Sequence, residues 1–339
     1  MGYRSAFHFI VLNLFDFYYR FFHQYTSRAF KIFIGTVSER TNIRQGWQRR
    51  LITNVIKFGA KAGVAECSLT LGKAYLNNRI FPRSDYDAAY WLYKSALLGN
   101  SEAQYLLGLL YLSGLPMERV SSEYLGTPWS QPKRPSLEEG TRWLKRASDQ
   151  GHAPASGKLG DILINGPQNI RNIGEGLRLL LFAAKKDVQL AQFILGNYFI
   201  GIAADDESIR RVAAAYVFRS ASQGYPSAVY VKGLLLESGF GIARDRKAAA
   251  QCFKVASEFN IPEALRSYAK ELISGEFVAK NILLAETILR KSARAGDVES
   301  AKMLSQYYTD GLFFHKNQIE ASFWKQRVLS VHHKTILTP

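Results

Sequence analysis

The chain has 339 residues, of which 44 are Lys or Arg and 28 are Asp or Glu, so its formal net charge at pH 7 is +16. Such an excess of positive charge favours polyanionic partners, namely anionic lipid, RNA or acidic protein surfaces. The two cysteines, Cys67 and Cys252, exclude a disulfide-rich class, and both are predicted to lie at buried positions of helices.

Residues 1–50 form a first domain, an aromatic and basic arm that does not recur elsewhere in the chain. Within residues 7–22 the polar side chains Asn13, Asp16 and Arg20 recur at intervals of three and four, which places them in one narrow stripe of a helix. The opposite side of this predicted amphipathic helix is lined by Phe9, Leu12, Phe15, Tyr19 and Phe22. An apolar face of this extent predicts anchoring on a membrane surface or on a partner protein.

Three other interpretations of this segment compete with anchoring. A signal peptide is disfavoured, because charges interrupt the apolar run and no small-residue cleavage motif follows it. A single membrane span is disfavoured, because the run has about sixteen residues where roughly twenty are needed. Alternatively, the helix only caps the first repeat. The basic stretch that follows, residues 24–50, gives the arm the composition of a mitochondrial targeting segment.

The second domain, residues 51–339, is built from repeats that are marked by a series of turn-forming residues. Successive markers, which we call corners, are 36 residues apart with two exceptions of 52 and 37: Gly63, Gly99, Gly151, Asp187, Gly224, Asn260, Gly296 and His332. Gly, Asp, Asn and His are the residue types that best tolerate a positive φ. Self-similarity at a period of this size predicts an array of stacked repeats.

Each repeat has the pattern of two helices joined at the corner. Nine residues after the corner a small residue recurs, which predicts close helix packing: Gly72, Gly108, Gly160, Gly196, Gly233, Ala269 and Ser305. The second helix is predicted to end at a glycine about fifteen residues after the corner, one residue early at Gly201. A last apolar stretch, residues 319–331, predicts a lone capping helix. The predicted fold class is therefore all-α, a right-handed α/α solenoid of about seven repeats with a terminal capping helix, preceded by the amphipathic N-terminal helix.

The residues of the second repeat carry a family resemblance. The run from Ala89 to Ala96, followed by Gly99-Asn100, Ala103-Gln104 and Leu107-Gly108, resembles the Sel-one-like repeat, a relative of the tetratricopeptide repeat. The resemblance extends over roughly residues 51–332. Members of that family typically act as adaptors and scaffolds for multiprotein or membrane-associated assemblies, and the resemblance implies such a role here.

The corner spacing of 52 residues contains an insertion at about residues 115–136. The insertion is rich in proline and interrupts an otherwise regular array, as docking loops often do. Its candidate docking residues are Tyr124 and Trp129.

A basic side chain recurs five residues before the corner, in the predicted last turn of the first helix: Lys94, Arg146, Arg219, Lys291 and Arg327. One interpretation is a basic stripe that binds an anionic partner. The interpretation that we favour is a set of solvated side chains whose aliphatic stems cover neighbouring helices.

No spacing of His, Cys, Asp and Glu predicts a metal site, and no phosphate-binding loop is present, so we expect no cofactor and no enzymatic activity. We expect a non-catalytic scaffold or accessory subunit that contacts the protein subunits of a larger, membrane-associated complex, with the mitochondrial inner membrane favoured. A cytoplasmic or bacterial envelope-associated adaptor is an alternative. A rival of another class is an RNA-associated subunit of a ribonucleoprotein such as a mitochondrial ribosome, which the positive charge favours.

Overall fold

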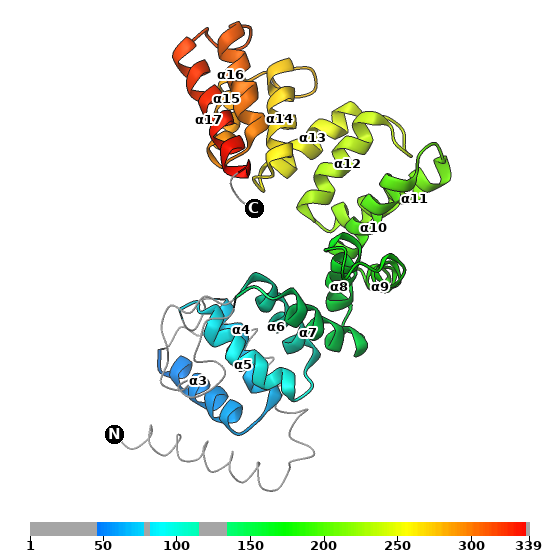
Figure 1. Cartoon of the computed structure of the whole chain (residues 1–339), viewed down its shortest axis with the longest axis vertical. Coiled ribbons are helices and arrows are strands. Elements are labelled where there is room, and N and C mark those ends of the chain that lie inside the picture. Colours follow the sequence, from blue (N-terminus) through cyan, green and yellow to red (C-terminus); the bar gives the residue numbers. More distant parts are fainter. Residues whose placement is uncertain (1–45, 78–81, 115–133, 337–339) are drawn as a thin grey trace. The chain divides into compact units, whose positions relative to one another are not determined.

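A computed structural model describes residues 46–77, 82–114 and 134–336 (Figure 1). Within these ranges the chain forms fifteen helices and no strand. The helices are α3 (Gly46–Lys61), α4 (Ala65–Leu76), α5 (Asp85–Leu97), α6 (Ser101–Ser113), α7 (Leu137–Asp149), α8 (Ala153–Asn165), α9 (Ile173–Lys185), α10 (Gln189–Ile202), α11 (Glu207–Ser222), α12 (Pro226–Ser238), α13 (Arg246–Ser257), α14 (Pro262–Ser274), α15 (Ile282–Arg294), α16 (Val298–Asp310) and α17 (Gln318–Ile336). Helices α3 to α16 make seven pairs and α17 follows alone, so the predicted all-α repeat fold is confirmed.

The chain divides into two compact units, Met1–Ser156 and Gly157–Pro339, which we call the N-terminal unit and the C-terminal unit. Within each unit the extensive contacts join helices that are consecutive in the sequence, such as α4 with α5 and α10 with α11. Contacts confined to neighbours are the property that distinguishes a repeat array from a single globular core.

The corners have the backbone conformation that the sequence predicts. All seven that separate the helices of a pair have positive φ, from 59° at Asn260 to 104° at Gly296. The prediction of an eighth corner at His332 is wrong, because His332 lies inside α17, which continues to Ile336. No second helix follows α17 among the described residues, so nothing in the packing requires a turn at this position.

Most helix ends follow local capping rules. At the start of nine helices a side-chain oxygen accepts hydrogen bonds from backbone N–H groups, and the residues that supply this oxygen are Ser84, Asn100, Ser136, Asn172, Asp206, Asp245, Asn281, Asp297 and Asn317. Left-handed glycines end α12, α14 and α16 as predicted. The predicted stop at Gly201 is wrong, because α10 runs on to Ile202. The positive φ falls instead on Ala204, whose carbonyl accepts a hydrogen bond from Arg210.

The predicted close packing is present at the five glycines that lie nine positions after a corner. A Cβ added at Gly72 would lie 2.6 Å from Leu92 Cγ, and one at Gly233 would lie 2.6 Å from Phe253 Cε1. At Gly108 it would lie 3.1 Å from the carbonyl oxygen of Gly140, so here the two helix backbones themselves are in contact. The first helix of each following repeat therefore presses on this glycine.

The terminal helix α17 covers the end of the last core cluster. Its Trp324 is fully buried together with Leu289 of α15 and Leu304 of α16. The Ser305 hydroxyl, at the glycine position of the last repeat, donates a hydrogen bond to the carbonyl of Ala321 over 2.9 Å. The prediction of a capping helix is confirmed. None of the described helices has both the length and the apolar composition needed to cross a bilayer.

Replacing Gly108 by Leu should force α6 and α7 apart and lower the free energy of unfolding by at least ~1–3 kcal/mol, as overpacking does. Thermal or urea unfolding followed by circular dichroism measures the change. Gly174→Ala is the matched control, because its added Cβ meets nothing closer than 3.8 Å. Equal stability of the Gly108 variant and this control would contradict the packing described here.

Candidate functional site

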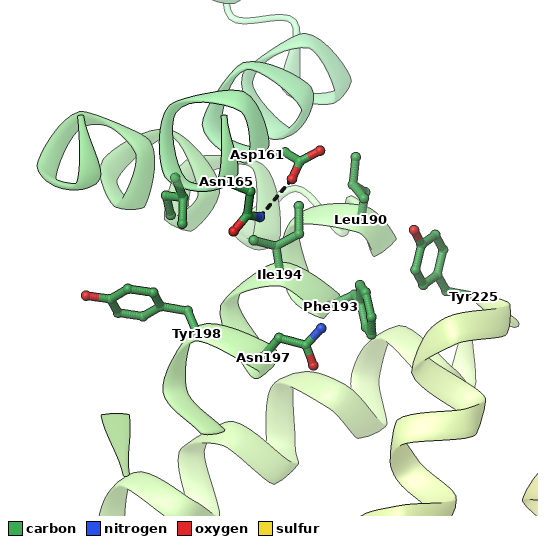
Figure 2. Close-up of a pocket in the computed structure, with 9 residues that line it drawn as sticks. Asp161, Asn165, Leu190, Phe193, Ile194, Asn197, Tyr198 and Tyr225 are labelled. Atoms are coloured by element: carbon green, nitrogen blue, oxygen red, sulfur yellow. Dashed lines mark hydrogen bonds between the residues drawn. The ribbon is translucent and has the colours of Figure 1, made fainter. Parts of the chain in front are cut away.

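The C-terminal unit contains a groove with a volume of about 370 Å³ on its second helices (Figure 2). Its walls come from α8, α10 and the residue that precedes α12. The lining residues are Asp161, Ile164, Asn165, Leu190, Phe193, Ile194, Asn197, Tyr198 and Tyr225.

The repeat register explains why these side chains share one surface. Asp161 and Asn197 each lie ten residues after a corner, so they hold the same place in consecutive repeats. The position before them, nine after the corner, is the glycine that packs against the next repeat. Ile194 is buried and Asn197 is exposed, so the groove has an apolar base and a polar rim.

The polar groups of the groove are only partly engaged. The Asp161 carboxylate binds Lys158 Nζ over 2.8 Å and accepts a hydrogen bond from Asn165 Nδ2 over 3.0 Å. The amide of Asn197 has no hydrogen-bond partner among the described residues. A free amide offers one acceptor and two donor positions, which suits the backbone of an extended peptide.

Aromatic rings lie at the two sides of the groove. Figure 2 shows Tyr198 and Tyr225 on opposite sides with Asn197 between them. The ring of Tyr225 lies 5.1 Å from that of Phe193. Burial raises the pKa of the Tyr225 hydroxyl, and the charge of Asp161 raises it further, so the hydroxyl stays protonated and can donate a hydrogen bond.

Four of the five basic positions of the predicted stripe lie near the ends of first helices, and Arg327 lies in the middle of α17. Two of the five stack on aromatic rings. Lys94 Nζ is 4.7 Å from the ring centre of Tyr90, and the guanidinium of Arg146 is 4.6 Å from that of Trp143. Cation–π contacts of this kind stabilise the helix that carries them.

Two further members of the stripe also bind within the fold. Arg219 pairs with Asp187 over 2.7 Å, and Arg327 donates to the carbonyls of Ala293 and Arg294 over 3.3 and 2.9 Å. Lys291 is exposed at the end of α15. At the same repeat position other repeats carry apolar residues, Phe58, Phe182 and Val255. These contacts match the favoured structural interpretation, and ligand binding by the stripe stays a prediction.

Buried glutamines form a connection between repeats that the sequence analysis missed. Gln104 is 4% exposed, and its Nε2 donates to the carbonyl of Ala96 over 3.1 Å. Its Oε1 accepts from Gln150 Nε2 of the next repeat over 2.7 Å. Gln192 and Gln223 make the same pair in the C-terminal unit. The recurrence of Gln five residues after one corner and one residue before the next is the sequence signal that identifies this link.

A second polar cluster joins three repeats of the N-terminal unit. The Glu102 carboxylate accepts from His152 Nε2 and binds Lys73 Nζ, each over 2.9 Å. His152 Nδ1 accepts a hydrogen bond from the backbone N–H of Ala155, so the ring proton is on Nε2. The hydrogen bond from His152 is the main cause that lowers the pKa of Glu102 to about 2, with Lys73 contributing in the same direction against desolvation.

The described residues hold no group of three His, Cys, Asp or Glu side chains placed to bind a metal ion. Cys67 is buried as predicted, and burial raises the pKa of its thiol to about 12. Cys252 is half-buried. The predicted anchoring residues (Phe9, Leu12, Phe15, Tyr19 and Phe22) and docking residues (Tyr124 and Trp129) lie outside the described residues.

Paired helices, left-handed corners and glycine contacts between repeats define an α-solenoid. Within that class, a family model described as Sel1 repeat matches the chain over residues 71–100, 101–123, 129–152, 227–258 and 262–297. The chain therefore carries Sel1 repeats, and the resemblance to this family is confirmed. Sel1 repeats typically serve as scaffolds for protein–protein interaction and are generally non-catalytic.

Solved structures show the same fold. A Sel1 repeat protein from Oxalobacter formigenes is 21% identical, with a TM-score of 0.60 over 77% of this chain and 99% of its own. A protective antigen of uropathogenic Escherichia coli strains, displaying an SLR fold, is 20% identical, with a TM-score of 0.58 over 82% of this chain. The chain spans 56% of the length of that antigen. No curated protein sequence matches the chain.

The Glu102 cluster predicts a defined pH dependence of stability. The carboxylate takes up a proton near pH 4.5 in the unfolded chain but only near pH 2 in the folded protein. Because the folded pKa is the lower one, the stabilisation is complete above about pH 4.5 and is lost as the pH falls towards about 2. Glu102→Gln should therefore flatten the fall in stability across this window.

Urea unfolding at a series of pH values between these limits measures the effect. Glu138→Gln is the matched control, since Glu138 forms only an exposed pair with Arg142 within its own helix. A Glu102 variant whose pH profile parallels that of the wild type would show that the cluster adds nothing to stability.

Proposed function

We propose that the protein is a non-catalytic scaffold subunit whose groove between α8, α10 and α12 binds an extended segment of a partner protein. The observation that carries this proposal is the free amide of Asn197 at the polar rim of a groove with aromatic sides. Aromatic rings supply apolar contact area, and an amide recognises a peptide backbone without specifying its sequence. The occurrence of Sel1 repeats supports the same role.

We propose further that the scaffold works in a membrane-associated complex, with the mitochondrial inner membrane as the favoured location. The support is the apolar face that the sequence predicts for the arm, with Phe9, Leu12, Phe15, Tyr19 and Phe22, followed by a basic stretch. A bacterial adaptor in the cytoplasm or at the envelope is the alternative location.

An RNA-associated subunit is the competing function, and the net charge of +16 favours it. Binding to RNA weakens steeply with salt because counterions are released, whereas apolar docking does not. Retention of the full chain on its native assembly across a salt series separates the two functions.

The groove is tested by Asn197→Arg, which places a long cation where a peptide backbone would lie. Native purification followed by mass spectrometry should show the recovery of one or more partner subunits reduced about tenfold, the result of losing roughly 1.4 kcal/mol of binding free energy. Gln306→Arg is the matched control, because Gln306 is exposed at the same repeat position in the last repeat. Equal recovery with both variants would exclude the groove as the binding site.

The arm is tested by changing Phe15 and Phe22 together to Asp. Burial of each such side chain is worth roughly 1.5–3 kcal/mol, so the wild-type protein should resist extraction from membranes by high salt while the variant should be extracted. The circular dichroism spectrum must stay helical. A variant that resists extraction as the wild type does would contradict anchoring, and one that unfolds would show that the helix caps the first repeat.

A further inference from the structure

The C-terminal unit carries exposed apolar side chains on α15, the loop 311–317 and α17, and both of these helices pack against α16 (Figure 1). The large exposed apolar side chains of these elements are Leu283, Leu284, Leu312, Phe313, Ile319, Phe323 and Leu329. Leu283 is 75% exposed, Leu312 is 74% exposed and Ile319 is 83% exposed. A repeat that ends an array normally has a polar outer side, which keeps the array soluble. We call the exposed surface of these three elements the terminal face.

The register makes Leu283 and Ile319 of the terminal face neighbours. Leu283 and Ile319 are 36 residues apart and hold the same place in consecutive repeats. Helices α15 and α17 are joined by the contact of Arg290 with Glu320, at 3.1 Å, and by the hydrogen bonds from Arg327 to the end of α15. Equivalent positions of two such helices lie side by side on the same side of the array.

Within the elements of the terminal face, the charges that have no ion pair among the described residues are positive. Lys291, Arg294, Lys316 and Lys325 are all exposed, the first two in the last turn of α15 and the others in the loop and in α17. The acids within Ile282–Arg294 and residues 311–329 are Glu286 and Glu320, and both bind Arg290, at 2.9 and 3.1 Å. Asp310, just before the loop, is the nearest other acid in the sequence. The terminal face therefore combines exposed Leu, Ile and Phe side chains with cations that have no ion pair among the described residues.

We infer that the terminal face binds the surface of an anionic lipid bilayer, with Leu312, Ile319 and Phe323 entering the headgroup region and the lysines contacting lipid phosphates. Basic side chains next to exposed aliphatic and aromatic ones are the composition that binds such a surface. A protein partner fits less well, because lysine is depleted in protein interfaces. The inference goes beyond the proposed scaffold function, because it uses neither the groove nor the arm.

The test measures binding of the full chain to vesicles by sedimentation, using the Phe15→Asp, Phe22→Asp protein so that the arm does not contribute. With vesicles of phosphatidylcholine and about 30% phosphatidylserine, binding should persist and weaken with salt, and with phosphatidylcholine alone it should be lost. Adding Ile319→Asp and Phe323→Asp should weaken the remaining binding at least about tenfold.

The matched control is Leu97→Asp with Leu98→Asp, which introduces the same charge at an exposed apolar pair in the N-terminal unit. It should bind vesicles as its parent does, and thermal unfolding of each variant checks that the repeats stay folded. The inference is overturned if the arm-deficient protein does not bind anionic vesicles, which is the result expected if the terminal face binds a protein instead. It is also overturned if the substitutions at Ile319 and Phe323 weaken binding no more than those at Leu97 and Leu98. Loss of partner subunits from the groove variant is a separate readout, so failure of one proposal leaves the other standing.

Discussion

Each repeat depends on one contact, in which the first helix of the following repeat lies against a glycine of the preceding second helix. The side chain seven residues before the next corner fills the space over that glycine, as Leu92 does over Gly72 and Phe253 over Gly233. Leu, Val and Phe all serve as the covering residue, because the missing Cβ admits different shapes. At Ser305 the hydroxyl instead donates a hydrogen bond to the carbonyl of Ala321 in α17.

Because this contact uses one side of each second helix, the other sides are free to carry binding residues. The residue next to the packing glycine is Asp161 in one repeat, Asn197 in the next and an exposed leucine, Leu234, in the one after. The groove occurs where two such residues are polar and the flanking residues are aromatic. Packing at the glycine therefore sets how the helices are arranged. The residue that follows this glycine varies between repeats, and its identity decides where a ligand can bind.

The repeat period and the helix pairs could be predicted from the sequence, because the corner and the packing glycine each require a particular residue type at one position. A positive φ or a missing Cβ excludes most residue types wherever the repeat occurs, so the period is visible in one sequence. Two predicted helix boundaries were wrong. At Gly201 the loop that follows α10 decides where the helix ends, and at His332 no further helix follows α17 among the described residues, so no turn is required. The groove was missed because it needs side chains of two repeats, and the spacing does not encode the relative rotation of those repeats. The glutamine link was also missed, although its two residues recur at fixed places in the repeat.

Several of the basic side chains make contacts within the fold, and these contacts weaken the inference from net charge to a polyanionic partner. Lys94 and Arg146 stack on rings, Arg219 pairs with Asp187, and Arg290 holds two glutamates and a tyrosine inside the last repeat. Arg219 and Arg290 contribute little to attraction over distance, since carboxylates offset their charges, whereas the neutral rings beside Lys94 and Arg146 leave those charges in place. The terminal face differs because its acids face Arg290 and its lysines are left to solvent. The net charge of the whole chain is thus a weaker argument for a partner than the exposed cations and exposed apolar side chains that occur together on α15, the loop 311–317 and α17.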